Sequence, residues 1–192
     1  MKASMSSSIG EAGTAPRTTW EWARLVGNAV NLSTPLGLGV ALLGRARIRA
    51  MPGGLYRADG YRPRFPLAGA FTIGNVIITA RPDWDAYDAA SPRTLVHEQR
   101  HTWQWLICGP LFLPAYALSL GWSWLRTGNQ GSANVFERLA GLADGGYPDL
   151  PRRPLRIGLE SALRTARAAT TRSRSLHVVP FASCARDAND TT

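Results

Sequence analysis

Cysteine, lysine and histidine are scarce in this chain of 192 residues. The two cysteines, Cys108 and Cys184, provide no disulfide framework and no metal-ligand spacing, which fits a reducing compartment. Residues 1–19 hold no apolar stretch, so no cleavable secretion signal is evident and we expect a cytoplasmic protein. There is no internal repeat, and the length suggests one domain with appended tails.

A single lysine stands against 21 arginines, and the formal net charge is +9. The arginines gather in two regions, 45–64 and 152–174. No aromatic residues alternate with them in the manner of a nucleic-acid-binding motif, so nucleic acid is not an expected partner. An anionic membrane surface is the better partner for such clusters, although a solvated basic surface explains them as well.

Apolar periodicity and turn signals predict an α+β fold. The predicted helices cover about 18–33, 91–108, 133–143 and 155–169. The predicted strands cover 46–50, 55–57 and 71–79, with a turn at Pro52-Gly53-Gly54, a loop at 80–91 and an ambiguous apolar run at 36–43. We therefore expect a disordered leader at 1–19, one folded domain at 20–148, and a basic helix with a disordered tail at 149–192.

The most informative pattern is His97-Glu98-Gln99-Arg100-His101, which has the form His-Glu-x-x-His. Residues four apart in a helix lie one above the other, so both imidazoles can bind one zinc ion. Glu98 would then stand beside the metal-bound water as its general base. Chance alone produces the pattern about 0.001 times in a chain of this composition. The alternative interpretation is a pair of solvated polar residues on a helix.

Twenty residues without a formal charge, 106–125, follow the motif, with tryptophans near both ends. A straight helix of that length spans ~30 Å, about the thickness of a bilayer core, so a transmembrane segment is one interpretation. Gly109, Pro110 and Pro114 would interrupt such a helix. A buried helical hairpin, or a segment that dips into one leaflet, therefore fits the same composition.

A zinc site needs a third protein ligand, and the best downstream candidate is Glu137. If 106–125 crossed a bilayer as a straight helix, Glu137 would lie ~30 Å from His101, whereas zinc–ligand bonds are only ~2 Å long. We expect the chain to fold back after the motif and bring Glu137 to the histidines. The alternative is a ligand from the loop at 80–90.

Residues 70–144 resemble the gluzincin class of zinc metallopeptidases, in particular its minimal members. The run 70–78 is similar to the strand that precedes the metal helix in the small zincin-like domain of extracellular contractile injection system proteins. Residues 95–104 are similar to the His-Glu-x-x-His-x-x-Gln of those families, and 136–140 to the Glu-x-x-Ala of their second helix. The arrangement also resembles small uncharacterised bacterial proteins with an apolar segment between these elements.

The resemblance implies a zincin-like fold, in which a small antiparallel sheet packs on the histidine helix, an apolar helix and a Glu-bearing helix. It implies His97, His101 and Glu137 as zinc ligands and Glu98 as the catalytic base. It also implies that an extended substrate lies along the edge strand 71–79, with contacts at Gly74, Asn75 and Val76.

One position departs from the family pattern. Many gluzincins have an aspartate that orients the first histidine, and this chain has Gly141 there. Loss of such a partner weakens metal affinity or activity.

The function expected from these residues is zinc-dependent hydrolysis of peptide bonds in a peptide or protein through a metal-activated water. The enzyme would be attached to, or partly inserted in, the inner face of a bacterial membrane. One alternative is a zincin-like binding or scaffold module without turnover. Another is a small membrane-associated protein without enzymatic activity. Tyr116, Tyr147 and Arg138 remain unassigned candidates for stabilising an oxyanion, and His177 is assigned no role.

Overall fold

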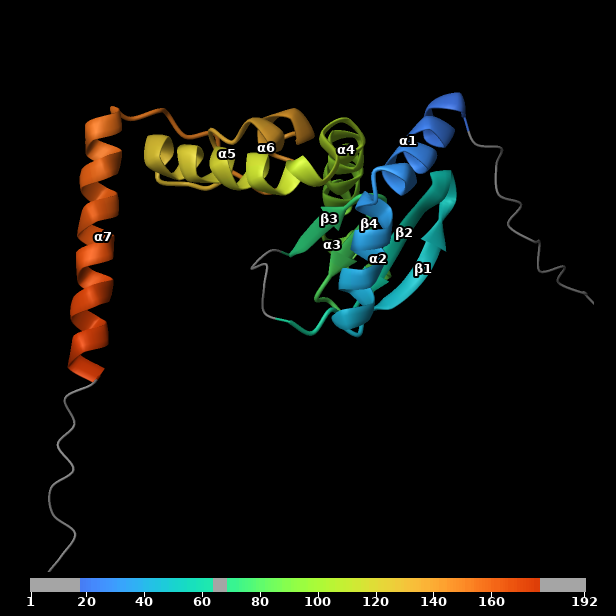
Figure 1. The fold of residues 1–192 in the computed structure, drawn as a ribbon, viewed down its shortest axis with the longest axis horizontal. Helices are drawn as coiled ribbons and strands as arrows, with labels where there is room; N and C mark the ends of the chain where they lie inside the picture. Colours follow the sequence, from blue (N-terminus) through green and yellow to red (C-terminus); the bar gives the residue numbers. More distant parts are fainter. Residues whose placement is uncertain (1–17, 64–68, 177–192) are drawn as a thin grey trace, which may run out of the picture.

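The computed structural model describes residues 18–63 and 69–176, so residues 1–17 of the leader predicted at 1–19, and residues 177–192 of the predicted tail, lie outside the described residues. The helices are α1 Thr19–Val30, α2 Ser33–Leu43, α3 Trp84–Ala90, α4 Pro92–Cys108, α5 Phe112–Thr127, α6 Val135–Ala140 and α7 Leu155–Leu176 (Figure 1). The strands are β1 Arg47–Met51, β2 Leu55–Asp59, β3 Ala70–Ile73 and β4 Val76–Thr79, and the 3-10 turns are η1 Pro52–Gly54 and η2 Gly109–Leu111.

The sheet has four strands in the order β1-β2-β4-β3 and is mixed. The hairpin of β1 and β2 is antiparallel, as predicted, but β2 pairs with β4 in parallel. The prediction of a purely antiparallel sheet is wrong because the single strand expected at 71–79 folds back on itself. Its two halves, β3 and β4, form a tight antiparallel hairpin, and β3 takes the edge position.

The β3–β4 turn at Gly74 and Asn75 packs against the junction of α1 and α2. Gly74 has φ +59, and a Cβ there would lie 2.4 Å from the backbone nitrogen of Thr34, so only glycine fits. The side chain of Asn28 donates a hydrogen bond of 2.8 Å to Oδ1 of Asn75. Gly74, Asn75 and Val76 are therefore buried and do not form the exposed strand edge that we expected to contact substrate.

Helices cover both faces of the sheet. Successive strand residues point to opposite faces, so Val76 and Ile78 pack with Ala41 of α2, whereas Ile77 packs with Trp84 of α3. Trp105 of α4 is fully buried, and its indole donates a hydrogen bond of 2.8 Å to the carbonyl of Thr72 on β3. This bond and the packing around it fix α4 against the edge strand.

Four helices differ from the sequence prediction. The ambiguous run at 36–43 belongs to α2, and α7 continues to Leu176. Within the predicted loop at 80–91, Asp83 accepts hydrogen bonds from the backbone of Asp85 and Ala86 and starts α3. The helix expected at 133–143 is the shorter α6, because Gly141 adopts φ +92 and ends it.

Among the described residues, one helical run, Pro92–Thr127, is long and apolar enough to cross a membrane, judged by length and composition alone. The pair of α1 and α2 passes this test only when the two are counted together, and it is bent by 70°. Within the first run, η2 separates α4 from α5, and the two helices point in different directions (Figure 1). This turn in the chain lets α5 and α6 pack beside α4.

The turn at Gly74 allows a direct test of the packing between the hairpin and α2. We expect Gly74→Ala to lower the free energy of unfolding by about 3 kcal/mol or more, through left-handed backbone strain and a backbone clash. Gly60→Ala is the matched control, because Gly60 has φ +74 and a Cβ there meets only an atom at 4.0 Å. The control should lose about 1 kcal/mol. Urea unfolding measures both, and equal losses would contradict the packing described.

Candidate metal centre

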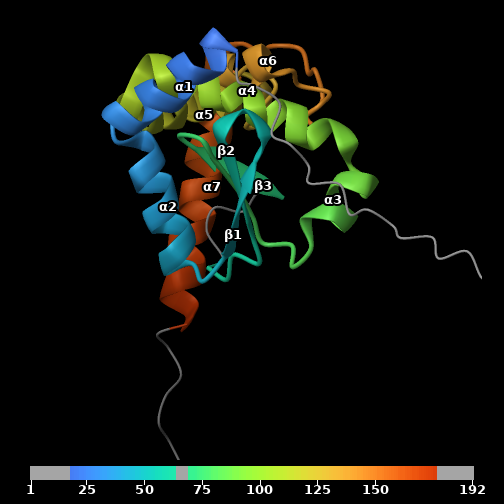
Figure 2. The same cartoon turned by 90° about the vertical axis from the view of Figure 1, so that its right-hand side faces the viewer.

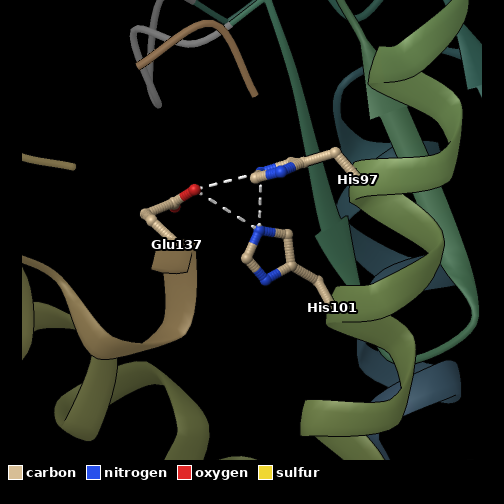
Figure 3. A group of neighbouring side chains, drawn as sticks. All are labelled: His97, His101 and Glu137. Atoms are coloured by element: carbon tan, nitrogen blue, oxygen red, sulfur yellow. Dashed lines mark hydrogen bonds and ion pairs between the residues drawn. The ribbon is translucent and has the colours of Figure 1, made fainter. Parts of the chain in front are cut away.

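The two motif histidines lie on one face of α4. The helix begins as predicted, with Ser91 at the N-cap and Pro92 in the first turn. His97 and His101 are one turn apart, and their rings point toward Glu137 (Figure 3). Both are nearly inaccessible, with exposed fractions of 3% and 6%. The alternative interpretation, a pair of solvated polar residues, therefore does not describe them.

The third member of the cluster, Glu137, comes from α6, which α5 holds in place. Ser123 accepts a hydrogen bond of 2.7 Å from the backbone of Ala133, and Ser119 accepts one of 2.9 Å from Val135. These bonds satisfy backbone donors at the start of α6. The short helix then presents Glu137, which is 2% exposed, to the histidines.

The three side chains converge on one point. Oε2 of Glu137 lies 3.0 Å from Nε2 of His97 and 3.8 Å from Nε2 of His101. The two Nε2 atoms are 3.1 Å apart. The group of His97, His101 and Glu137 could therefore hold a metal ion.

The outer nitrogen of each ring has a hydrogen-bond acceptor. Nδ1 of His97 lies 3.0 Å from the carbonyl oxygen of Gly141, which can only accept a proton. Nδ1 of His101 lies 2.7 Å from Oε1 of Gln104, whose Nε2 donates to the carbonyl of Phe136. This network assigns the ring proton to Nδ1 in both histidines when they are neutral. Both Nε2 atoms then face the cluster with a free lone pair.

Three lone-pair atoms thus face one another in a buried place, and Oε2 of Glu137 has no hydrogen-bond donor there. Buried polar atoms without a partner cost free energy, and a shared cation satisfies all three at once. Because the donor set of two imidazoles and one carboxylate is typical of a metal site, the residues present fit a metal ion.

A backbone carbonyl is the partner of the first histidine. The carbonyl of Gly141, the residue at which the resemblance leads us to expect an aspartate, accepts from Nδ1 of His97. A metal-bound histidine commonly donates its second ring N–H to a carboxylate or to a backbone carbonyl, so either group serves. Sequence reasoning missed this contact because a carbonyl is present at every residue and leaves no mark in a motif.

Tyr116 and Thr72 orient the two carboxylates of the site. The hydroxyl of Tyr116, on α5, donates to Oε1 of Glu137 and leaves Oε2 to face the histidines. The hydroxyl of Thr72, on β3, donates to Oε2 of Glu98 at 2.7 Å. Tyr116 was an unassigned candidate in the sequence, whereas nothing in the sequence pattern singled out Thr72.

Burial and neighbouring charges change the acidity of the cluster. Burial by itself raises the pKa of Glu137, but contacts with His101, His97 and Tyr116 outweigh it and lower that pKa to about 2. Burial by itself lowers the pKa of His101, but the hydrogen bond to Glu137 and the nearby carboxylates outweigh it and raise that pKa. Burial raises the pKa of Glu98. Glu137 is therefore the charged carboxylate, and Glu98 is the more easily protonated one.

The loop 141–147 covers the cluster. Gly145 lies against the ring of His97, where a Cβ would approach the ring to 2.5 Å. The ring of Tyr147 is 6.5 Å from that of His97, between centroids, and burial raises the pKa of Tyr147 to about 12. A pocket opens beside this loop, lined by 91–94 of α4 and by 143–146.

The structure brings His97, His101, Glu137 and Glu98 together, and it places Gly74, Asn75 and Val76 in contacts with α1 and α2 instead. No protein-family model, curated protein or solved structure matches the chain. The resemblance to the gluzincins therefore remains a prediction.

Replacing Glu137 tests the metal site. We expect Glu137→Gln to weaken zinc binding at least about 100-fold, because it removes the anionic ligand while an amide oxygen still accepts from Tyr116. Glu160→Gln is the matched control, since Glu160 is exposed on α7 and pairs only loosely with Arg164 at 3.9 Å. Equilibrium dialysis with elemental analysis measures the bound metal. Unchanged zinc content in the Glu137 variant would contradict the site.

Zinc affinity should depend on pH. The raised pKa of His101 means that a proton competes with the metal at the same Nε2, so affinity falls as pH decreases below that pKa and levels off above it. One competing proton gives a decrease of about tenfold per pH unit. Titration against a competing chelator between about pH 5.5 and about pH 8 measures this slope. Affinity that is independent of pH in this window would contradict the assignment of His101 as a ligand.

Proposed function

We propose that the protein is a zinc-dependent metallopeptidase of the gluzincin type, with a zincin-like fold. The observation that supports this most directly is the convergence of Nε2 of His97, Nε2 of His101 and Oε2 of Glu137, with Glu98 next to them. Two imidazoles and a carboxylate from a His-Glu-x-x-His helix and a second helix are the ligands of catalytic zinc in this class.

The spacing of the three atoms suits zinc. Bonds of about 2.0–2.1 Å at tetrahedral angles place ligand atoms about 3.3 Å apart. The three separations here are 3.0, 3.1 and 3.8 Å, which bracket that value. Nitrogen and carboxylate ligands favour zinc over the hard cations magnesium and calcium, which prefer oxygen alone. Zinc in such a site acts as a Lewis acid and lowers the pKa of a coordinated water.

Glu98 is the proton carrier in this proposal. Oε2 of Glu98 accepts from Thr72, which leaves Oε1 to take a proton from the attacking water. The buried position raises the pKa of Glu98, which makes its carboxylate a better proton acceptor for the attacking water and a donor to the leaving amine nitrogen once protonated. Thr72, on the edge strand β3, holds the carboxylate of Glu98 in place. Its backbone carbonyl accepts a hydrogen bond from Trp105, and this bond holds α4 against the same strand.

Substrate access requires movement of the loop 141–147. His97, Glu98 and His101 are each at most 6% exposed, and Gly145 lies directly on His97. An extended peptide can therefore reach the cluster only when this loop swings out.

Two observations favour the peptidase proposal over the alternatives. A scaffold module without turnover was suggested by the missing aspartate at Gly141, but a carbonyl takes over that contact. A membrane protein with a merely interfacial histidine helix was suggested by the apolar segment, but His97 and His101 face inward to Glu137. The peptidase proposal accounts for both features.

Glu98→Gln separates catalysis from metal binding. We expect the turnover number on an unfolded protein substrate to fall by about 10³, because the amide cannot carry the proton. Zinc content should stay stoichiometric, since Glu98 is not a ligand in this proposal. Glu160→Gln should leave both quantities unchanged. A zinc-loaded wild type that cleaves neither unfolded proteins nor a peptide library would instead identify a binding module.

A further inference from the structure

Two long stretches of the chain, 25–44 and 101–125, contain no Asp, Glu, Lys or Arg. Arginine is the first charged residue at all four ends: Arg24 and Arg45 for the first stretch, and Arg100 and Arg126 for the second. The first stretch forms the second half of α1 and all of α2, and the second forms the end of α4, η2 and most of α5.

Polar side chains in both stretches point inward. In the first, Asn28, Ser33 and Thr34 are buried, and Asn28 bonds to Asn75. In the second, Tyr116 bonds to Glu137, and Ser123 accepts from the start of α6. The usual arrangement of a water-exposed helix, with polar groups outside, is reversed here.

The outward sides of these helices are apolar. On α2 and the residue before it, Leu32, Leu36 and Leu43 recur at helical spacing, and Leu43 is 86% exposed. From the end of α4 through η2 and along α5, the exposed residues Ile107, Leu111, Leu118 and Trp122 recur at helical spacing, and Ile107 is 82% and Leu118 77% exposed. Of the 18-residue apolar window in the run 92–127, only 17% is buried. We call these seven residues the α2–α5 face.

The two halves of the α2–α5 face lie on neighbouring parts of the molecule. In Figure 2, α2 lies to the left of the sheet, and α6 lies above and to the right of α5. The two halves also meet, since Asn31 at the end of α1 donates to the carbonyl of Trp105 at 3.1 Å and contacts Gly109.

We propose that the α2–α5 face inserts into one leaflet of a bilayer that contains anionic lipid. Apolar side chains on an uncharged face enter the acyl region, and Arg45 and Arg126 at its ends suit anionic headgroups, whereas Arg24 is buried and Arg100 pairs with Asp144. The guanidinium carbon of Arg126 lies over the ring of Trp122, 5.2 Å from the ring centroid, and such a pair suits the lipid–water interface. A second copy of the chain is a poorer occupant, because each copy brings a formal charge of +9.

The bends of the two helix pairs place the face in one leaflet and not across the bilayer. The α1–α2 pair turns by 70°, and η2 redirects the chain between α4 and α5. A spanning run 92–127 would also carry His97, Glu98 and His101, whose buried contacts with Thr72 and Glu137 belong to the folded domain. The face therefore lies on the membrane while the domain stays outside it. This inference does not depend on the metal site.

Vesicle flotation with the full-length protein tests the proposal. Wild type should float with phosphatidylcholine vesicles that contain about 30% phosphatidylglycerol, and much less with phosphatidylcholine alone. Leu36→Asn and Leu118→Asn should each lower the partition coefficient about 10-fold, and the double variant about 100-fold. Leu139→Asn on α6, 69% exposed, is the matched control and should leave partitioning unchanged. Far-UV circular dichroism and urea unfolding verify that each variant is folded.

Three results would overturn the proposal. The first is failure of the folded wild type to float, and the second is flotation that the double variant retains. The third is complete release at about 0.5 M NaCl, which would show adsorption by charge alone, because salt screens charges but does not weaken apolar insertion. A dimer in vesicle-free buffer that the double variant dissociates, together with no flotation, would assign the α2–α5 face to a second copy.

Discussion

Three buried electron-pair donor atoms that converge on one point are the constraint on which the rest of the structure depends. Nε2 of His97 and of His101 and Oε2 of Glu137 repel one another unless a proton or a metal ion lies between them. The contacts of Gly141, Gln104 and Tyr116 hold each side chain in this orientation from outside. A fold that keeps such a cluster buried needs rigid elements on both sides of it, and α4 and α6 provide them.

The apolar segment between the motif and Glu137 builds this rigidity. Phe112 at the start of α5 packs at a tilt against Trp105 and edge-to-face against Phe136, so the turn at η2 is held against both the histidine helix and the glutamate helix. The serines of α5 then hold the start of α6. The residues between His101 and Glu137 thus fold back at η2 and bring the Glu137 carboxylate to the two imidazole rings.

The ligand cluster was more predictable from the sequence than the sheet was. The spacing of His97 and His101 is a local property of a helix, and Glu137 follows from the need for a third ligand within reach. The parallel pairing of β2 with β4 depends on the fold-back at Gly74, whose cause is contact with Thr34, a residue forty positions away. The group of Gly141 that accepts from His97 is a backbone carbonyl, and no side-chain pattern can predict that contact. Contacts that depend on distant backbone atoms are therefore the ones that sequence reasoning misses.

The inversion of polarity in α5 connects the metal cluster with the exposed face. Tyr116 and Ser123 on one side of α5 serve Glu137 and the start of α6, so this side must be polar although it is buried. With those polar groups committed inward, Leu118 and Trp122 are left on the opposite side, where water is a poor solvent for them. In water alone, the exposed leucines of α2 and α5 would add nothing to stability. Insertion into a bilayer would transfer these leucines from water to the acyl chains, while the polar side of α5 stays buried in the protein.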